Sequence, residues 1–107
     1  MYFHAAEAGL KTELLRQNPR VCALFVREAS VIEQKLTTRY VSVLVRGTAR
    51  EITDSAEKCR ALRLLCAKFA PSAADHAEST IQSAAAHTAV WCVEIDSITG
   101  KANPAQA

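Results

Sequence analysis

The alternation of apolar and polar residues between Thr37 and Thr53 constrains the fold of this chain most. In the run TTRYVSVLVRGTAREIT, every second residue from Val41 to Val45 is valine, while Tyr40 and Ser42 lie on the opposite face. This two-residue period is typical of a β-strand with two different faces. Gly47 interrupts the pattern and predicts a bend or bulge, as is needed where a barrel curves. The chain is therefore expected to build a curved sheet.

Three other segments have strand character. Arg20–Glu28 mixes β-branched and aromatic residues without helical spacing, which predicts a largely buried strand. Met1–Ala5 is expected to be the end of a strand, and Thr88–Ile98 a final strand. One face of this final strand carries Trp91, Val93 and Ile95. Trp91 is expected to pack in the core or at an interface.

Two segments have helical spacing instead. Ala6–Gln17 has apolar residues at every fourth position and is followed by Asn18-Pro19, which predicts a short amphipathic helix. A second helix is expected to begin at Asp54, whose side chain is placed to cap it, and to end before Pro71. Its apolar stripe consists of Cys59, Leu62, Leu65, Cys66 and Phe69. The Ala-rich stretch 72–87 is expected to be a loop or a loosely held helix, so the fold class is mainly β with flanking helices (α+β).

The composition indicates one globular domain. The chain has 107 residues, of which 50% are hydrophobic and 22% charged, and its net charge is +2. This charge is too small and too dispersed to predict a nucleic-acid or membrane partner. No stretch resembles a secretory or transmembrane segment, so a cytoplasmic location is the default expectation. The four cysteines are expected to be reduced core residues, because their spacing fits no zinc site.

Three pieces of the sequence, in this order, resemble one known family. MYFHAAEAGLKTELLRQNPRVCALF, YVSVLVRGTAREITDSAEKCRALRLLCAKFAP and TAVWCVEIDSITGK are similar to successive elements of the pyridoxamine 5'-phosphate oxidase-like split-barrel family, in particular its nitroimidazole-reductase-like branch. The resemblance implies a partial split β-barrel of the FMN-binding type over residues 1–101, followed by a flexible tail, 102–107. It also implies a homodimer with FMN at the subunit interface. Because the resemblance begins at Tyr2, the family's N-terminal helix and first strands are expected to be missing.

Lys11 is the first candidate for cofactor binding. It lies in the first turns of the expected helix, where unpaired N–H groups and the helix dipole favour an anion. The resemblance implies that this lysine contacts the FMN phosphate, because GLK follows the tyrosine-containing strand as the family's basic residue does. A plain solvated lysine is the alternative.

Ser42, Tyr40 and Lys101 are further candidates for cofactor binding. A serine hydroxyl can both donate and accept a hydrogen bond at a flavin ring edge, and the resemblance implies such a contact for Ser42. The alternative is an ordinary strand serine that faces water or a partner chain. Tyr40 lies on the same face and either stacks near the ring or packs, and Lys101, in ITGK, is placed to reach a phosphate from the chain end.

His4 is the candidate catalytic residue. The motif YFH resembles the histidine near the flavin in the nitroimidazole-reductase-like branch, where an imidazole that titrates near neutrality suits proton transfer or substrate contact. An exposed histidine at a strand end is the alternative. His76 and His87 are eleven residues apart, which fits no metal pattern, so no metal site is expected.

The resemblance implies an FMN-dependent oxidoreductase that passes electrons from NAD(P)H to a small oxidised substrate such as a nitro-aromatic. The flavin would supply the chemistry, and the protein would orient the flavin and tune its electrostatic environment. The alternative is a non-catalytic split-barrel remnant, or dimerisation module, that has lost the flavin. Binding of oxidised flavin, visible as a yellow colour, separates the two.

Overall fold

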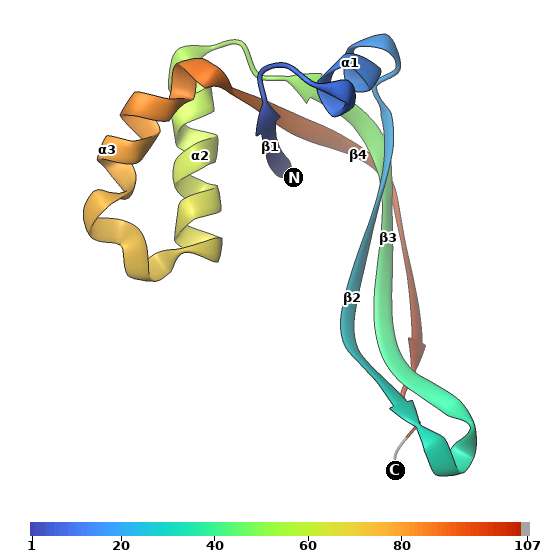
Figure 1. Ribbon diagram of the computed structural model, residues 1–107. Coiled ribbons are helices and arrows are strands. Elements are labelled where there is room, and N and C mark those ends of the chain that lie inside the picture. The colour runs from blue at the N-terminus through green and yellow to red at the C-terminus, as the bar shows by residue number, and fades with distance from the viewer. Residues whose placement is uncertain (106–107) are drawn as a thin grey trace. The chain divides into compact units, whose positions relative to one another are not determined.

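A computed structural model describes residues 1–105 of the chain (Figure 1). Four strands are hydrogen-bonded in the order β1-β4-β3-β2. They are β1 (Tyr2–Ala6), β2 (Arg20–Ile32), β3 (Thr37–Glu51) and β4 (Thr88–Asn103), and the helices are α1 (Leu10–Gln17), α2 (Ser55–Phe69) and α3 (Ala74–Ala84). The fold is therefore mainly β with flanking helices, and it is a partial split barrel as expected.

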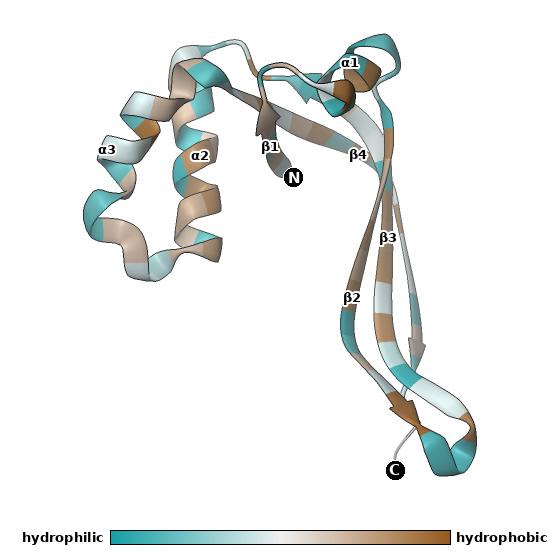
Figure 2. Ribbon diagram, viewed as in Figure 1, coloured by the Kyte–Doolittle hydropathy of each residue, from teal (hydrophilic) through white to brown (hydrophobic). Residues whose placement is uncertain are grey.

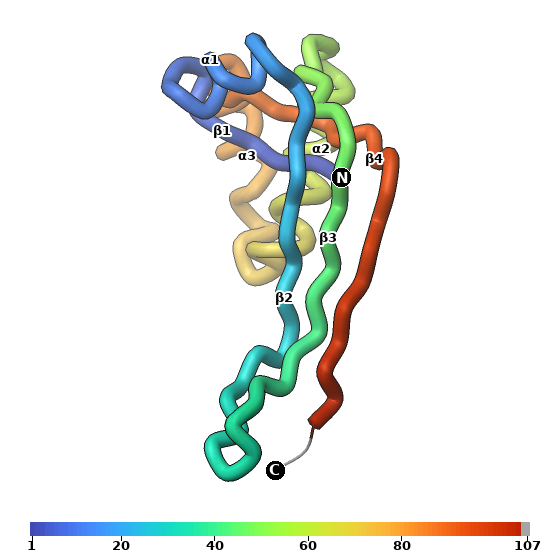
Figure 3. Tube along the Cα trace, turned by 90° about the vertical axis from the view of Figure 1, so that its right-hand side faces the viewer, coloured from blue at the N-terminus to red at the C-terminus, as the bar shows by residue number. Residues whose placement is uncertain are grey.

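The chain divides into two compact units that share the long strands. The helical unit contains Met1–Arg20 and Ala49–Glu94, and hence β1, all three helices and the first half of β4. The hairpin unit contains Val21–Thr48 and the chain from Ile95 onward. In the hairpin unit, β2 and β3 lie side by side with the second half of β4 next to β3 (Figure 3).

The core of the helical unit lies between the sheet and α2. Ile52, Ala61, Leu62, Ile81 and Val90 form its buried cluster, and Val90 is fully buried. The amide of Ile52 donates to the carbonyl oxygen of Val90 at 2.8 Å, which fixes the end of β3 against β4. The partly buried side chains of Tyr2 and Cys92 pack against the same cluster, so β1 and β4 present one face to α2.

Helix α2 begins as the sequence predicts. The carboxylate of Asp54 accepts a hydrogen bond from the Glu57 amide at 2.9 Å and so satisfies one free N–H of the first turn. Glu57 does not complete a capping box, because its carboxylate pairs with Arg50 instead. The apolar stripe is buried at Leu62 and half-buried at Leu65, but Phe69 at its end is 74% exposed.

The first helix and the Ala-rich stretch differ from the expectation. Helix α1 begins at Leu10 and not at Ala6, because β1 extends to Ala6 and Gly9, with φ 143°, turns the chain at the helix N-cap. The stretch 72–87 contains the regular helix α3, because its alanines favour helix and Ile81 is buried against α2. The bidentate pair of Arg63 and Glu78 adds a second link between α2 and α3.

Several strands are longer than predicted. Strand β2 continues to Ile32, passing Glu28, which has φ 56°. Strand β4 continues to Asn103, two residues into the expected tail, and the Asn103 side chain donates to Thr37 Oγ1 and to the Thr38 carbonyl. Strand β3 runs through Gly47 without interruption, because it is paired on both sides. The tail residues 106–107 lie outside the described residues.

Exposed apolar side chains are concentrated in the hairpin unit, whose strands carry much of the hydrophobic colour in Figure 2. They are Leu24, Phe25, Val26, Val31, Leu36, Ile95 and Ile98. Ile95 lies on the same face of β4 as Trp91, but it is 45% exposed whereas Trp91 is 2% exposed. The expectation of a largely buried strand at Arg20–Glu28 was wrong, because β2 is an edge strand and most of its residues are exposed. Cys22 is also exposed on β2, an edge strand, and not in the core, whereas the other three cysteines are half-buried; all four are free thiols.

Candidate functional site

The N-terminus of α1 carries the first candidate, Lys11. The amide of Glu13 donates to the Gly9 carbonyl at 3.0 Å, which closes the first turn and leaves the earlier amides of the helix without an intrahelical partner. Lys11 is exposed in this turn, and it lines a hollow of about 560 Å³ together with Arg20. Lys11 therefore lies at the helix N-terminus, where the acidic Glu13 partly offsets its charge, whereas Arg20 lines the hollow beyond the C-terminus of α1.

Two side chains hold α1 in place. Thr12 is 2% exposed, and its hydroxyl donates to the Ala6 carbonyl at 2.8 Å, which ties the helix to the end of β1. Arg16 makes two hydrogen bonds to the carboxylate of Glu51, at 3.0 and 2.9 Å, and this pairing holds the pKa of Glu51 below its usual range. The orientation of Lys11 thus depends on contacts with both β1 and β3.

His4 lies on β1 with its side chain exposed. It lines a hollow of about 500 Å³ between β1 and the C-terminal half of α2. The other residues of this hollow are Tyr2, Phe3, Leu62, Leu65, Cys66, Phe69 and Ala70. The His4 imidazole and the Tyr2 hydroxyl are therefore the polar side-chain groups in this largely apolar lining.

The remaining candidates lie in the hairpin unit. Tyr40 and Ser42 are two residues apart on β3, so they share one face of the strand, and both are half-buried. The Ser42 hydroxyl donates to the Lys101 carbonyl on β4 at 3.4 Å, whereas the Lys101 residue itself is exposed. The predicted residues are therefore divided into two groups, with His4 and Lys11 in the helical unit and the other three in the hairpin unit.

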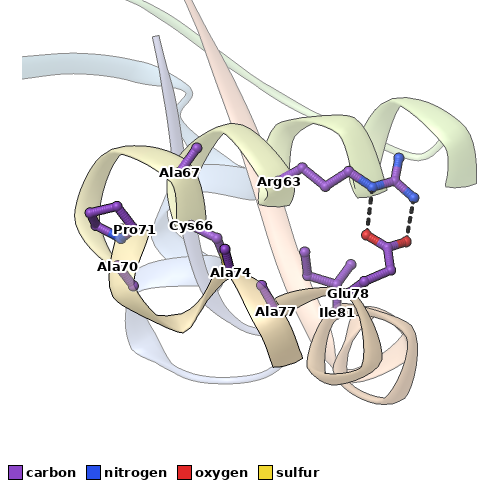
Figure 4. Close-up of a pocket in the computed structure, with 9 residues that line it drawn as sticks. All are labelled: Arg63, Cys66, Ala67, Ala70, Pro71, Ala74, Ala77, Glu78 and Ile81. Carbon is purple, nitrogen blue, oxygen red and sulfur yellow. Dashed lines mark hydrogen bonds and ion pairs between the residues drawn. The ribbon is translucent and has the colours of Figure 1, made fainter.

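Sequence reasoning missed a smaller hollow between α2 and α3 (Figure 4). Its volume is about 210 Å³, and Cys66, Pro71, Ile81 and four alanines line it. Arg63 and Glu78 bridge one end, with nitrogen–oxygen distances of 2.8 and 2.6 Å, and this contact lowers the pKa of Glu78 to about 2. Because its two charges already satisfy each other, this hollow offers a ligand little besides apolar contact.

Two features are absent from residues 1–105. No three His, Cys, Asp or Glu side chains in this part of the chain gather in a way that could hold a metal ion. Among the same residues, no helix has the length and apolar character needed to cross a membrane.

Comparison with known proteins identifies the family. The family model described as pyridoxamine 5'-phosphate oxidase matches residues 1–102. A crystal structure of a proposed 5-nitroimidazole antibiotic resistance protein from Bacteroides thetaiotaomicron superimposes with a TM-score of 0.74 at 28% sequence identity, over 92% of this chain and 58% of that protein. The chain thus spans little more than half the length of this relative, and the comparison with curated proteins found no match. The chain belongs to the pyridoxamine 5'-phosphate oxidase family.

Proposed function

We propose that this protein binds FMN and acts as an oxidoreductase, transferring electrons from NAD(P)H to a small oxidised substrate such as a nitro-aromatic compound. Membership of the family supports the cofactor, and the likeness to a proposed 5-nitroimidazole resistance protein supports the substrate class. The observation that carries the proposal is the cationic N-terminus of α1, where Lys11 stands beside amides that have no intrahelical partner.

The α1 terminus suits the phosphate end of FMN. The phosphate of FMN is a dianion that accepts hydrogen bonds from backbone amides and from an ammonium group. Lys11 and the amides of the first helical turn offer both kinds of donor. Gly9 supports the fit, because a Cβ atom built there would meet nothing within 4 Å, so the approach to the helix end is open.

The candidates in the hairpin unit are proposed, from the family resemblance, as contacts of a flavin ring and are considered separately from the α1 terminus. Ser42 can turn its hydroxyl from the Lys101 carbonyl, a long contact of 3.4 Å, toward a ring edge, and Tyr40 on the same face can stack beside it. Lys101 adds a cation on β4. When bound, the flavin supplies the electron transfer, and His4 would donate a proton to the substrate or orient it.

The phosphate contact can be tested by comparing two ligands. The Lys11→Ala variant should lose about ten- to a hundred-fold in FMN affinity, because a charge-assisted hydrogen bond contributes roughly 1.5–3 kcal/mol. Its affinity for riboflavin, which has no phosphate, should stay nearly unchanged. The Lys35→Ala variant removes an exposed lysine at the tip of the β2–β3 hairpin and serves as the control. Titration with each ligand, followed by flavin fluorescence, measures these affinities.

Two results would contradict this assignment. Equal losses for FMN and riboflavin would mean that Lys11 supports the fold and not the phosphate. Unchanged affinity for both would return Lys11 to the role of a solvated lysine. If the purified protein shows no flavin absorbance and binds none when FMN is added, the oxidoreductase proposal itself fails.

The second candidate function is a split-barrel dimerisation module without flavin. The exposed apolar side chains of the hairpin unit favour association, because monomeric proteins rarely leave so many large apolar residues in contact with water. A homodimer is proposed under either function. The absorbance of oxidised flavin in the purified protein separates the two candidates, because only the first requires it.

A further inference from the structure

We propose that Arg16 is a positioning residue that keeps the N-terminus of α1 open to a phosphate by holding the carboxylate of Glu7 away from it. The inference rests on the proposed function, because the phosphate is that of FMN. It adds one property to that function, since Arg16 would set the preference of the site for FMN over riboflavin. The residues concerned all lie in the helical unit.

The N-cap of α1 leaves the first amides of the helix to a ligand. This N-cap is Gly9, which has no side chain that could accept a hydrogen bond from them. Helix α2 has the usual arrangement, in which the carboxylate of Asp54 accepts from the amide of Glu57 at 2.9 Å. An anion that binds at a helix N-terminus uses the same amides as a capping carboxylate does. A carboxylate that reached the N-terminus of α1 would therefore compete with a phosphate.

Glu7 is placed to be this competitor. It precedes the N-cap, Gly9, by only two residues, and the helix dipole favours a negative side chain at this end of a helix. The side chain of Glu7 is 52% exposed, so it has room to turn. At the helix end it would accept from the amides that a phosphate needs, and its charge would repel the phosphate dianion. The segment before α1 thus carries a group that can oppose phosphate binding.

Arg16 draws Glu7 elsewhere. Arg16 lies in the last turn of α1, but helical side chains incline toward the N-terminus, and its Nη2 atom lies 3.5 Å from Oε1 of Glu7. The same guanidinium donates to the carboxylate of Glu51 at 3.0 and 2.9 Å. The bidentate pair with Glu51 fixes the guanidinium against the end of β3, and the fixed cation attracts Glu7. Arg16 therefore both neutralises Glu7 and keeps it at a distance from the helix amides.

Releasing Glu7 tests this role. The Arg16→Gln variant should lose about three- to ten-fold in FMN affinity, because a charge at a helix terminus interacts at this level, while its riboflavin affinity should stay nearly unchanged. The double variant Arg16→Gln/Glu7→Gln should regain the FMN affinity of the unaltered protein, since a neutral amide competes far less with a phosphate. Titration with each ligand, followed by flavin fluorescence, measures the affinities. This recovery distinguishes positioning from support of the fold, because the second substitution does not restore the link between α1 and β3.

Two further variants separate the parts of the argument. Glu51→Gln removes the charge of the other partner and leaves Arg16 paired with Glu7, so the ratio of the FMN and riboflavin affinities should not change. Ala8→Glu leaves Arg16 in place and adds an exposed carboxylate next to the N-cap, so this ratio should fall. Ala8→Glu also covers the case in which circular dichroism shows that Arg16→Gln does not fold.

The outcomes distinguish this inference from the proposed function. If the unaltered protein binds no FMN, both fail. If it binds FMN, the role of Arg16 is overturned by an unchanged affinity ratio in Arg16→Gln or by a double variant that does not recover. An equal fall in Glu51→Gln would mean that the link between α1 and β3 matters and not the release of Glu7. An unchanged ratio in Ala8→Glu would show that a carboxylate in this segment does not compete, which also overturns the inference.

Discussion

Replacing Thr12 by valine removes one hydroxyl from a buried position and keeps the side-chain volume. Thr12 is 2% exposed, and its hydroxyl donates to the Ala6 carbonyl at 2.8 Å. A hydrogen bond of this kind contributes about 0.5–1.5 kcal/mol to the free energy of unfolding. Ala6 is an exposed residue, so water can partly replace the lost donor at its carbonyl. We therefore expect a loss of about 1 kcal/mol, which corresponds to a fall of roughly 0.3–1 M in the midpoint of urea unfolding.

The matched control is Thr80→Val on α3. Its hydroxyl also donates to a backbone carbonyl, that of His76 at 3.1 Å, but the residue is exposed, so its removal should cost little. Unfolding is followed by circular dichroism for both variants. If Thr12→Val is as stable as the unaltered protein, the bond to Ala6 does not hold α1 against β1. If FMN binds as proposed, the same variant should also bind it more weakly, because the bond positions the helix that carries Lys11.

Three shorter predictions concern the core, the helix pair and the thiols. Val90→Ala should destabilise the protein by roughly 2–3 kcal/mol in urea unfolding, since it removes two fully buried carbons at about 0.8 kcal/mol each and leaves a cavity. Val31→Ala removes the same two carbons from an exposed site and should destabilise the protein far less. The pKa of Glu78 is lowered to about 2 in the folded state, so the ion pair of Glu78 stabilises the protein above pH 4.5, the pKa of an ordinary glutamate, and this stabilisation is lost as the pH falls toward 2. The Glu78→Gln variant should therefore lose less stability than the unaltered protein over this pH range in an acid titration, and identical curves would refute the linkage. A bulky thiol reagent should label Cys22 much faster than Cys66 in the native protein, which mass spectrometry would detect, and equal rates would contradict the observed exposure.

Sequence periodicity predicted the elements whose pattern is local. The alternation around Ser42 defined β3, and the Asp54 cap defined the start of α2, because both depend on residues a few positions apart. The family resemblance, which rests on the order of three pieces, was confirmed over residues 1–102. Lys11 was expected in the first turns of a helix beginning at Ala6, and it lies in the first turn of α1 because that helix begins at Leu10.

Other features depend on contacts between distant segments. Helix α3 is stabilised by packing of Ile81 and by the ion pair between Arg63 and Glu78, so the polar, alanine-rich stretch alone gave no clear pattern. The extension of β4 to Asn103 rests on hydrogen bonds to β3, 65 and 66 residues away in the sequence. A local sequence pattern does not identify hydrogen-bond partners that are so far apart in the chain.

The candidate residues illustrate the same division. Sequence and resemblance named Lys11, Ser42 and His4 as residue types suited to a flavin or its substrate. Only the tertiary structure linked the Ser42 hydroxyl to β4 and showed that buried Thr12 fixes α1. It also set the register of β1 against β4, which decides which backbone groups of β1 bond to β4. A chain's sequence determines which groups are available, but the pairing of distant strands decides which of them remain free to bind.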